Sequence, residues 1–386
     1  MKSPASLLYS AAAFLISFGS LRAQNNPAVP SYGSSLVSSA HTADEAWTSV
    51  ISLATSRLDQ QKLAPALSPS TGSPPSSAQP VTTQPGLSPS AEPLSQIDQY
   101  IQASLAAQAY YRAYPTDARA SQAKKMETLF ALQSVELGAD SYRPTASALG
   151  TAYRVDKSNA ATDRFEVAQA MEVIALAPTL KGQRFLDVGV TYEQMADDLY
   201  GEFGELDQVY NVYTSIVRTT DPATSSRVAA KVLGRKQAPA WAKTEAQTAL
   251  DRNGLLGKPV NLKLTTVDGQ TIDLQRPGAQ ATVVYFWNGT SGGAELSLLN
   301  SIKWPSPPSA RWIYIALGGA AEPSATVKAQ APFPGSHCFE RAQFGGPTAA
   351  ALKVAQTPFA YVLNAAGQLT GFGPAADLPA LLQAAH

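Results

Sequence analysis

Hydrophobic positions follow two different periods along the chain, and the change of period divides it. From residue 95 to residue 255 the apolar side chains recur every three to four residues, which predicts amphipathic helices with one buried face. The clearest stripes are Val167, Met171 and Ile174, and then Leu206, Val209, Tyr210, Tyr213, Ile216 and Val217. After residue 256 the apolar residues form short continuous runs, which predict strands covered on both faces. These runs are Ala281–Trp287 and Trp312–Leu317.

Start and stop signals subdivide the helical region into six or seven predicted helices. Turns are expected at Tyr114-Pro115, Ala177-Pro178 and Gly204. Capping boxes are expected at Ser95 with Asp98 and at Thr191 with Gln194, and Asp221 precedes a first-turn proline, Pro222. The pattern is consistent with antiparallel hairpins stacked as an irregular α-solenoid or bundle. It contains no faithful repeat and no tetratricopeptide signature.

Three segments precede this region. Lys2 and the apolar stretch Leu7–Phe18 predict a secretory signal cleaved after Ala23, although an uncleaved signal stays open. No cysteine follows the stretch, which excludes a lipoprotein anchor, and no other segment is long and apolar enough to cross a membrane. In residues 24–63, Thr42–Leu58 predicts one amphipathic helix that either docks on the helical domain or binds a partner. Residues 64–94, rich in Pro, Ser and Thr, predict a flexible linker.

The last third, from Leu256 to His386, predicts an α/β domain. Asp268-Gly269 joins two short alternating segments and predicts a hairpin. Gln356–Gly373 adds a Thr-Pro step, a strand, a turn and a second strand. The sequence VVYFWNGTSGGAEL at Val283–Leu296 resembles the active-site strand and loop of thioredoxin-type proteins. The whole third resembles periplasmic TlpA-like thiol-disulfide oxidoreductases and redoxins, and a helical region ahead of it is similar to the layout of some of these proteins.

Both cysteines of the family's C-x-x-C motif are missing from this loop. Counting from Trp287 places the two positions at Ser291 and Ala294, whereas counting back from Glu295 places them at Gly289 and Gly292. The loop Asn288, Gly289, Thr290, Ser291, Gly292, Gly293 is therefore interpreted as a degenerate active site without catalytic residues. Ser291 is expected to cap a helix, because a serine hydroxyl ionises too reluctantly to replace a thiolate.

The resemblance also assigns a place to Thr357-Pro358. Redoxins carry a cis-proline beside the active-site loop at this point, which makes a shelf for an extended peptide. The alternative is an ordinary proline at the start of a strand.

Cys338 is the one cysteine of the chain and cannot form an intramolecular disulfide. It is expected on a short strand, as a buried or bystander thiol, with a one-cysteine redox role through mixed disulfides as the alternative. Its neighbour His337 should point to the opposite face of that strand.

Composition excludes several classes of function. The 29 Lys and Arg balance the 29 Asp and Glu, so no electrostatic footprint for nucleic acid is present. His41, His337 and His386 are scattered, which argues against a histidine metal site or triad. The acidic pairs Asp197-Asp198 and Glu202-Glu205 are interpreted as a solvated face. Neither a metal nor a cofactor is expected.

The sequence thus predicts five parts: a signal peptide at 1–23, a segment at 24–63, a linker at 64–94, an all-α domain at 95–255 and a thioredoxin-like α/β domain at 256–386. The first functional hypothesis is an exported binding or scaffold protein that has lost dithiol catalysis and holds an extended peptide or a protein at Thr357 and Pro358. The second is an exported thiol-disulfide oxidoreductase that acts through Cys338 or with a partner thiol.

Overall fold

The computed structural model describes residues 37, 40, 42–63, 95–180, 183, 188–275, 280–304, 309–319 and 321–385. They belong to two compact units, Met1–Lys181 and Gly182–His386. The predicted signal at 1–23 and linker at 64–94 lie outside the described residues, as do His41 and His386. The predicted domain boundary between residues 255 and 256 falls inside the second unit and stays a prediction.

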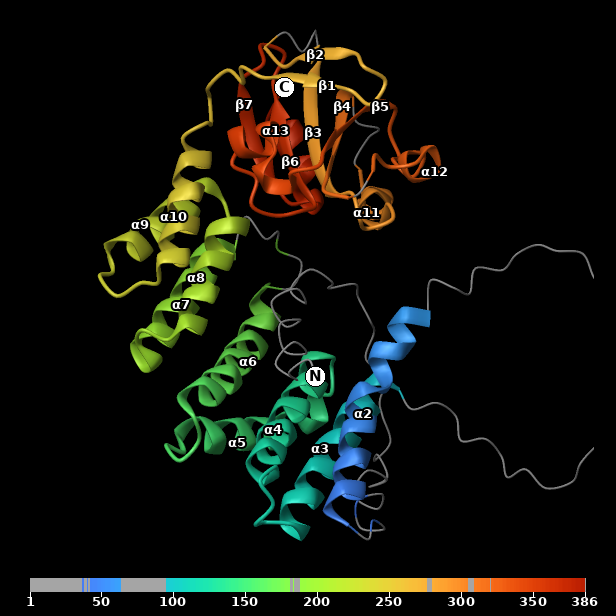
Figure 1. Ribbon diagram of the computed structural model, residues 1–386. Coiled ribbons are helices and arrows are strands. Elements are labelled where there is room, and N and C mark those ends of the chain that lie inside the picture. Colours follow the sequence, from blue (N-terminus) through green and yellow to red (C-terminus); the bar gives the residue numbers. More distant parts are fainter. Residues whose placement is uncertain are drawn as a thin grey trace, which may run out of the picture. The chain divides into compact units, whose positions relative to one another are not determined.

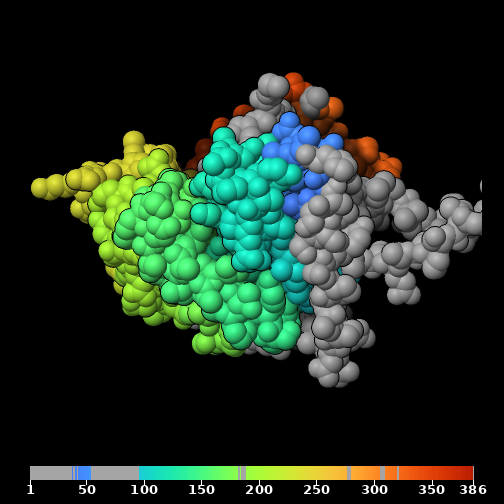
Figure 2. Space-filling model, turned by 90° about the horizontal axis from the view of Figure 1, so that it is seen from below, coloured from blue at the N-terminus to red at the C-terminus, as the bar shows by residue number. Residues whose placement is uncertain are grey.

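The first unit consists of helices. They are α2 (Ala43–Leu63), α3 (Gln96–Ala113), α4 (Ala120–Glu136), α5 (Arg143–Val155) and α6 (Ala161–Leu180). Helix α2 begins as predicted, because the Thr42 hydroxyl accepts a hydrogen bond from the backbone N–H of Glu45 at 3.2 Å. Its Trp47 ring lies 5.2 Å from that of Tyr110, so α2 packs against α3, blue on teal in Figures 1 and 2.

Four more helices open the second unit, α7 (Gly189–Phe203), α8 (Asp207–Thr219), α9 (Pro222–Gly234) and α10 (Ala240–Asn253) (Figure 1). The described part of residues 95–253 therefore holds eight α-helices, not six or seven. The turn expected at Ala177-Pro178 is wrong, because α6 continues through Pro178 to Leu180. Proline in the last turn removes only one hydrogen bond, so the helix can end just beyond it.

The predicted helix starts are partly correct. Ser95 accepts from the backbone N–H of Asp98 at 3.2 Å, and Asp221 accepts from those of Ala223 and Thr224 at 2.9 Å. The capping box at Thr191 and Gln194 is wrong, because α7 begins two residues before Thr191. Gly204 ends α7 with a φ of 64°, as the predicted turn requires. The stripe on α8 is buried as expected, with Val209, Tyr210, Tyr213, Ile216 and Val217 removed from solvent.

The rest of the second unit is built on a mixed five-stranded sheet. Its strands are β3 (Ala281–Asn288), β4 (Ala310–Leu317), β5 (Gly335–Glu340), β6 (Phe359–Leu363) and β7 (Leu369–Gly373). They lie in the order β5-β4-β3-β6-β7, with β3, β4 and β5 parallel and with β6 and β7 antiparallel to their neighbours. A separate hairpin joins β1 (Lys263–Thr265) to β2 (Thr271–Asp273). Gly269 in its turn has a φ of 81°, in keeping with the Asp-Gly signal.

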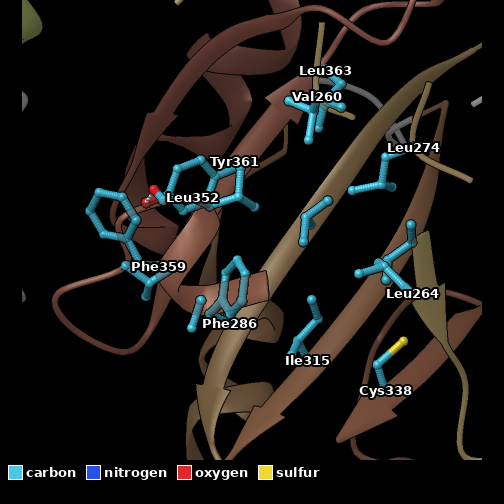
Figure 3. Packing of buried hydrophobic residues seen from close by; sticks show 14 of the residues in the cluster. Val260, Leu264, Leu274, Phe286, Ile315, Cys338, Leu352, Phe359, Tyr361 and Leu363 are labelled. Atoms are coloured by element: carbon cyan, nitrogen blue, oxygen red, sulfur yellow. Dashed lines mark hydrogen bonds between the residues drawn. The ribbon is translucent and has the colours of Figure 1, made fainter. Parts of the chain in front are cut away.

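Each face of this sheet is covered, which confirms the predicted α/β architecture. Alternate residues of a strand point to opposite faces, so the continuous apolar runs supply two cores. One face packs against α11 (Ala294–Ser301) and α14 (Leu378–Gln383), and the short helix α12 (Ala325–Lys328) lies on the same side. The other packs against the β1–β2 hairpin and α13 (Pro347–Ala351), as Figure 3 shows for Leu264, Ile315 and Tyr361. Helix α13 is a short element of five residues.

None of the described helices combines the length and apolar character that a membrane span requires.

Candidate functional site

The loop that replaces the C-x-x-C motif connects β3 to α11. Strand β3 ends at Asn288, which lies beside Leu317 of the parallel strand β4. The next N–H, that of Gly289, still donates to the Leu317 carbonyl at 2.9 Å. Helix α11 then begins at Ala294, after an N-cap Gly293 with a φ of 91°. The loop is thus a tight connection held against the end of the neighbouring strand.

Backbone geometry disfavours a side chain at each of the two glycines of the Glu295 register. A Cβ at Gly289 would lie 2.4 Å from the carbonyl oxygen of Gly318, which is backbone and cannot rotate away. Gly292 faces open space, but its φ of 63° lies in the left-handed region that L side chains rarely adopt. A thiol at Gly289 would therefore require this loop or the loop after β4 to move.

The polar side chains of the loop interact mostly with one another. The Asn288 side-chain oxygen accepts from the Thr290 backbone N–H at 2.9 Å and from its hydroxyl at 2.7 Å. The Ser291 hydroxyl is enclosed and has no hydrogen-bond partner among the described residues. The prediction that Ser291 caps the helix is wrong, because Gly293 holds the N-cap position and no side chain caps it. Three glycines in six residues let the chain turn twice before the helix starts, which moves the cap by two positions.

Glu295 in the first turn of α11 links the loop to the segment before β6. One carboxylate oxygen accepts from the Asn288 backbone N–H at 2.7 Å, and the other from the Thr357 hydroxyl at 3.4 Å. Burial raises the pKa of the Glu295 carboxyl, and the two hydrogen bonds oppose that rise. In the sequence, Glu295 serves only to set the register of the loop. An acidic residue in the first turn of a helix was the one available signal for a structural role.

The Thr357-Pro358 peptide bond is cis. It immediately precedes β6, which pairs with β3 from Phe286 opposite Phe359 onward. The Thr357–Glu295 hydrogen bond brings this segment to the Asn288–Gly293 loop. Among the hydrogen bonds of the described residues, none uses the backbone N–H of Gln356 or Thr357. The structure thus brings the predicted loop and shelf together and leaves backbone donors beside them.

Cys338 does not belong to this site. It lies on β5, 5% exposed, on the face covered by the β1–β2 hairpin, with its side chain near Leu264 and Ile315 (Figure 3). Burial, and to a lesser degree the nearby carboxylates of Glu340 and Asp268, raise the pKa of its thiol to about 12. The neighbouring His337 stacks on Tyr314, 5.0 Å between ring centroids, and burial lowers its pKa. Tyr314 belongs to the core of the opposite face, so the two side chains diverge as expected.

The acidic side chains of the helical region are engaged in ion pairs and hydrogen bonds. Asp197 accepts from Lys231 at 2.6 Å and from the Tyr213 hydroxyl at 2.8 Å. Glu205 accepts from the hydroxyls of Tyr200 and Tyr210. Within the described ranges, no group of three or more His, Cys, Asp or Glu side chains is arranged to hold a metal ion.

Comparison with known proteins finds likeness only at the level of solved structures. No protein-family model matches the chain. No curated protein matches it.

Three of the similar structures share 13 to 17% sequence identity with it. The C-terminal domain of a putative thiol-disulfide oxidoreductase from Bacteroides thetaiotaomicron is 13% identical, with 31% of this chain and 86% of that chain covered and a TM-score of 0.25. A putative thiol:disulfide interchange protein DsbE from Chlorobium tepidum is 15% identical, with 33% and 94% covered and a TM-score of 0.26. StoA from Bacillus subtilis is 17% identical, with 32% and 98% covered and a TM-score of 0.23. The likeness covers about a third of this chain and concerns its fold, not its chemistry.

Proposed function

We propose that this chain is an exported binding or scaffold protein whose thioredoxin-like domain holds an extended peptide without dithiol redox catalysis. The peptide would lie along the Asn288–Gly293 loop and the shelf formed by Thr357 and Pro358. The proposal of export rests on the signal pattern at residues 1–23.

One observation carries the proposal more than any other: the position that would hold the first thiol on the Glu295 register has no space for a side chain. The carbonyl of Gly318 closes off Gly289, and the single cysteine of the chain is packed in the core of the sheet. A dithiol cycle needs a thiolate that attacks and a second thiol that resolves the mixed disulfide. The closed position at Gly289 and the buried cysteine support a loop with a structural and not a catalytic role.

Peptide binding is supported by the unused backbone donors. An extended segment that pairs with a free edge of backbone gains main-chain hydrogen bonds, and its alternate side chains give specificity. The N–H groups of Gln356 and Thr357 are available for such pairing, and the hydroxyl of Thr357 is held by Glu295.

The redox hypothesis through Cys338 finds less support. A thiol whose pKa is about 12 carries almost no thiolate at neutral pH, and the thiolate is the nucleophile. A buried sulfur also cannot reach the disulfide of a partner without opening of the core.

A disulfide-reduction assay separates the two hypotheses. The mature protein and a Cys338→Ser variant are compared on insulin with dithiothreitol as donor, with a dithiol thioredoxin as positive control. We expect background rates in both. Turnover that disappears in the variant would overturn the binding proposal in favour of a one-cysteine enzyme.

Peptide binding is tested by panning a phage-displayed library of random peptides on the mature protein. Thr290 is exposed in the loop, so Thr290→Arg should obstruct the proposed peptide site at the loop and shelf. Thr265→Arg, at an exposed position of β1, is the matched control. We expect the enriched peptides to bind the control like the parent and the loop variant about tenfold or more weakly. Equal binding to both variants would place the peptide elsewhere and refute the shelf.

A further inference from the structure

A small cavity lies in the second unit, away from the loop discussed above. Its volume is about 230 Å³, slightly below the usual range for ligand pockets. Helices α8 and α10 form one side of it, and the segment around α13 forms the other. The lining includes Arg218, Glu245, Arg252, Phe344, Val354 and Ala355. It therefore combines three charged groups with an apolar wall.

Arg252 is the unusual member of this lining. It is only 1% exposed, and its guanidinium lies over the rings of Phe359 and Phe372 at 5.3 and 4.9 Å. One terminal nitrogen donates to the Val217 carbonyl at 3.0 Å, but Nε has no hydrogen-bond partner. Among the ion pairs of the described residues, none includes Arg252.

A buried guanidinium without a carboxylate is a departure from ordinary protein interiors, where charges are paired or coordinated. Removal of the charge from water is the main cause that lowers the pKa of Arg252. The nearby Tyr361 opposes this shift, and Arg218 adds to it. Arginine nonetheless stays charged under all ordinary conditions. The site thus holds a desolvated cation whose strongest possible partner, a planar anion, is not supplied by the described residues.

The charge balance of the cavity indicates what would fit. Arg218 and Glu245 form a loose pair at 3.6 Å, and one Glu245 oxygen is enclosed without a hydrogen-bond donor. Two guanidinium groups and one carboxylate leave one net positive charge, which matches a monoanion better than a phosphate dianion. The opposite wall is apolar and includes Phe344, a phenylalanine that is 42% exposed.

We propose that this cavity binds a small monocarboxylate with an apolar body, an aliphatic or aromatic carboxylic acid. Arg252 anchors the carboxylate through its planar fork, which suits that group geometrically. Ala355, Val354 and Phe344 contact the apolar body. The cavity is independent of the peptide site, because other residues of the second unit form it.

The test is calorimetric titration of the full chain with sodium benzoate and sodium hexanoate, with inorganic phosphate as a third probe. We expect both carboxylates to bind and phosphate to bind at least about tenfold more weakly. Glu245→Gln removes the competing negative charge without touching Arg252, so it should tighten benzoate binding about three- to tenfold.

Two variants should abolish binding for different reasons. Arg252→Met removes the anchor, and unfolding curves without ligand show whether it still folds. Ala355→Leu fills the cavity from its half-exposed side and leaves Arg252 in place, so the proposal stays testable if Arg252→Met does not fold. Arg143→Met is the matched control, because Arg143 is a half-exposed arginine of α5 paired with Asp140.

Loss of benzoate binding in Arg252→Met or Ala355→Leu, with Arg143→Met unchanged, would support the site. Three results would overturn it: no binding to the parent and to Glu245→Gln, undiminished binding to Ala355→Leu, or a preference for phosphate.

Discussion

Glu295 and Arg252 are both charged side chains drawn into the second unit, but they differ in how far their polar atoms are satisfied. Each oxygen of Glu295 accepts a hydrogen bond, one from Asn288 and one from Thr357. The Nε atom of Arg252 has no partner, and no carboxylate of the described residues pairs with the guanidinium. The charged side chain beside the loop that carries the family resemblance therefore has both oxygens hydrogen-bonded, whereas Arg252, which belongs to no motif, keeps one nitrogen without a partner.

A sequence motif and a buried group without a partner can therefore lie in different places of one domain. The motif resemblance points to the Asn288–Gly293 loop, where Asn288 and Thr290 bond one another. Arg252 sits in no motif, yet a buried cation without an anion is costly, and an external ligand is one way to offset that cost.

The largest expected effect comes from truncation of Arg252. Arg252→Ala should lower the free energy of unfolding by about 3 to 5 kcal/mol, because it leaves a cavity beneath Phe359 and Phe372. Arg252→Met keeps the volume and removes the unpaired charge, so it should cost less than about 1.5 kcal/mol. Urea denaturation measures both. Equal losses would mean that charge, not volume, gives Arg252 its role.

Gly289→Ala should be the most harmful change in the loop. The added Cβ meets the Gly318 carbonyl, and relief of this overlap should cost about 2 to 3 kcal/mol of stability. Gly201→Ala in α7 is the control, since nothing lies within 4 Å of the position that its added methyl group would take. Alanine also favours a helix, so this control should gain about 0.5 to 1 kcal/mol. A neutral Gly289→Ala in thermal unfolding would show that the loop yields easily.

Glu295→Gln tests the hydrogen-bonded member of this pair of buried charges through the pH dependence of stability. Burial raises the folded-state pKa of Glu295, so the folded protein binds its proton more tightly than the unfolded chain, whose value is about 4.3. The parent should therefore lose stability as the pH rises from about 4 through the raised folded-state pKa. Glutamine cannot ionise, so the variant should avoid this loss and gain up to about 1 kcal/mol at neutral pH.

Urea denaturation of parent and variant from about pH 4 to about pH 8 measures the difference in their free energies of unfolding. A gap between the two that narrows as the pH rises would contradict the direction assigned to the Glu295 pKa.

The smallest effect is expected at Ser291. Its enclosed hydroxyl has no partner among the described residues, so Ser291→Ala should change the free energy of unfolding by less than about 0.5 kcal/mol in either direction. Calorimetric melting is sufficient to measure it. A large loss would mean that the hydroxyl supports the loop.

The sheet was more predictable than the sites. Continuous apolar runs such as Ala281–Trp287 give strands within one or two residues, because a strand buried on both faces leaves little freedom in its pattern. The loop was found from its resemblance, but its closure at Gly289 depends on the approach of Gly318, which is distant in sequence.

Arg252 could not have been found in the same way. The buried face of α10 is marked by the alanines Ala242, Ala246 and Ala249, which give a weak apolar period, and an arginine after them reads as a solvent-facing residue. Only the packing of α10 beside Phe359 and Phe372 buries it.

The contact between Gly289 and Gly318 has an evolutionary consequence. A single substitution to cysteine at residue 289 should weaken the fold before any thiol activity appears, because the added Cβ would overlap a neighbouring carbonyl. A tolerated thiol at this position would need a prior rearrangement of the loop after β4. The contact therefore limits the chemistry that the loop can acquire by single substitutions, whereas it places no such limit on changes in what the domain binds.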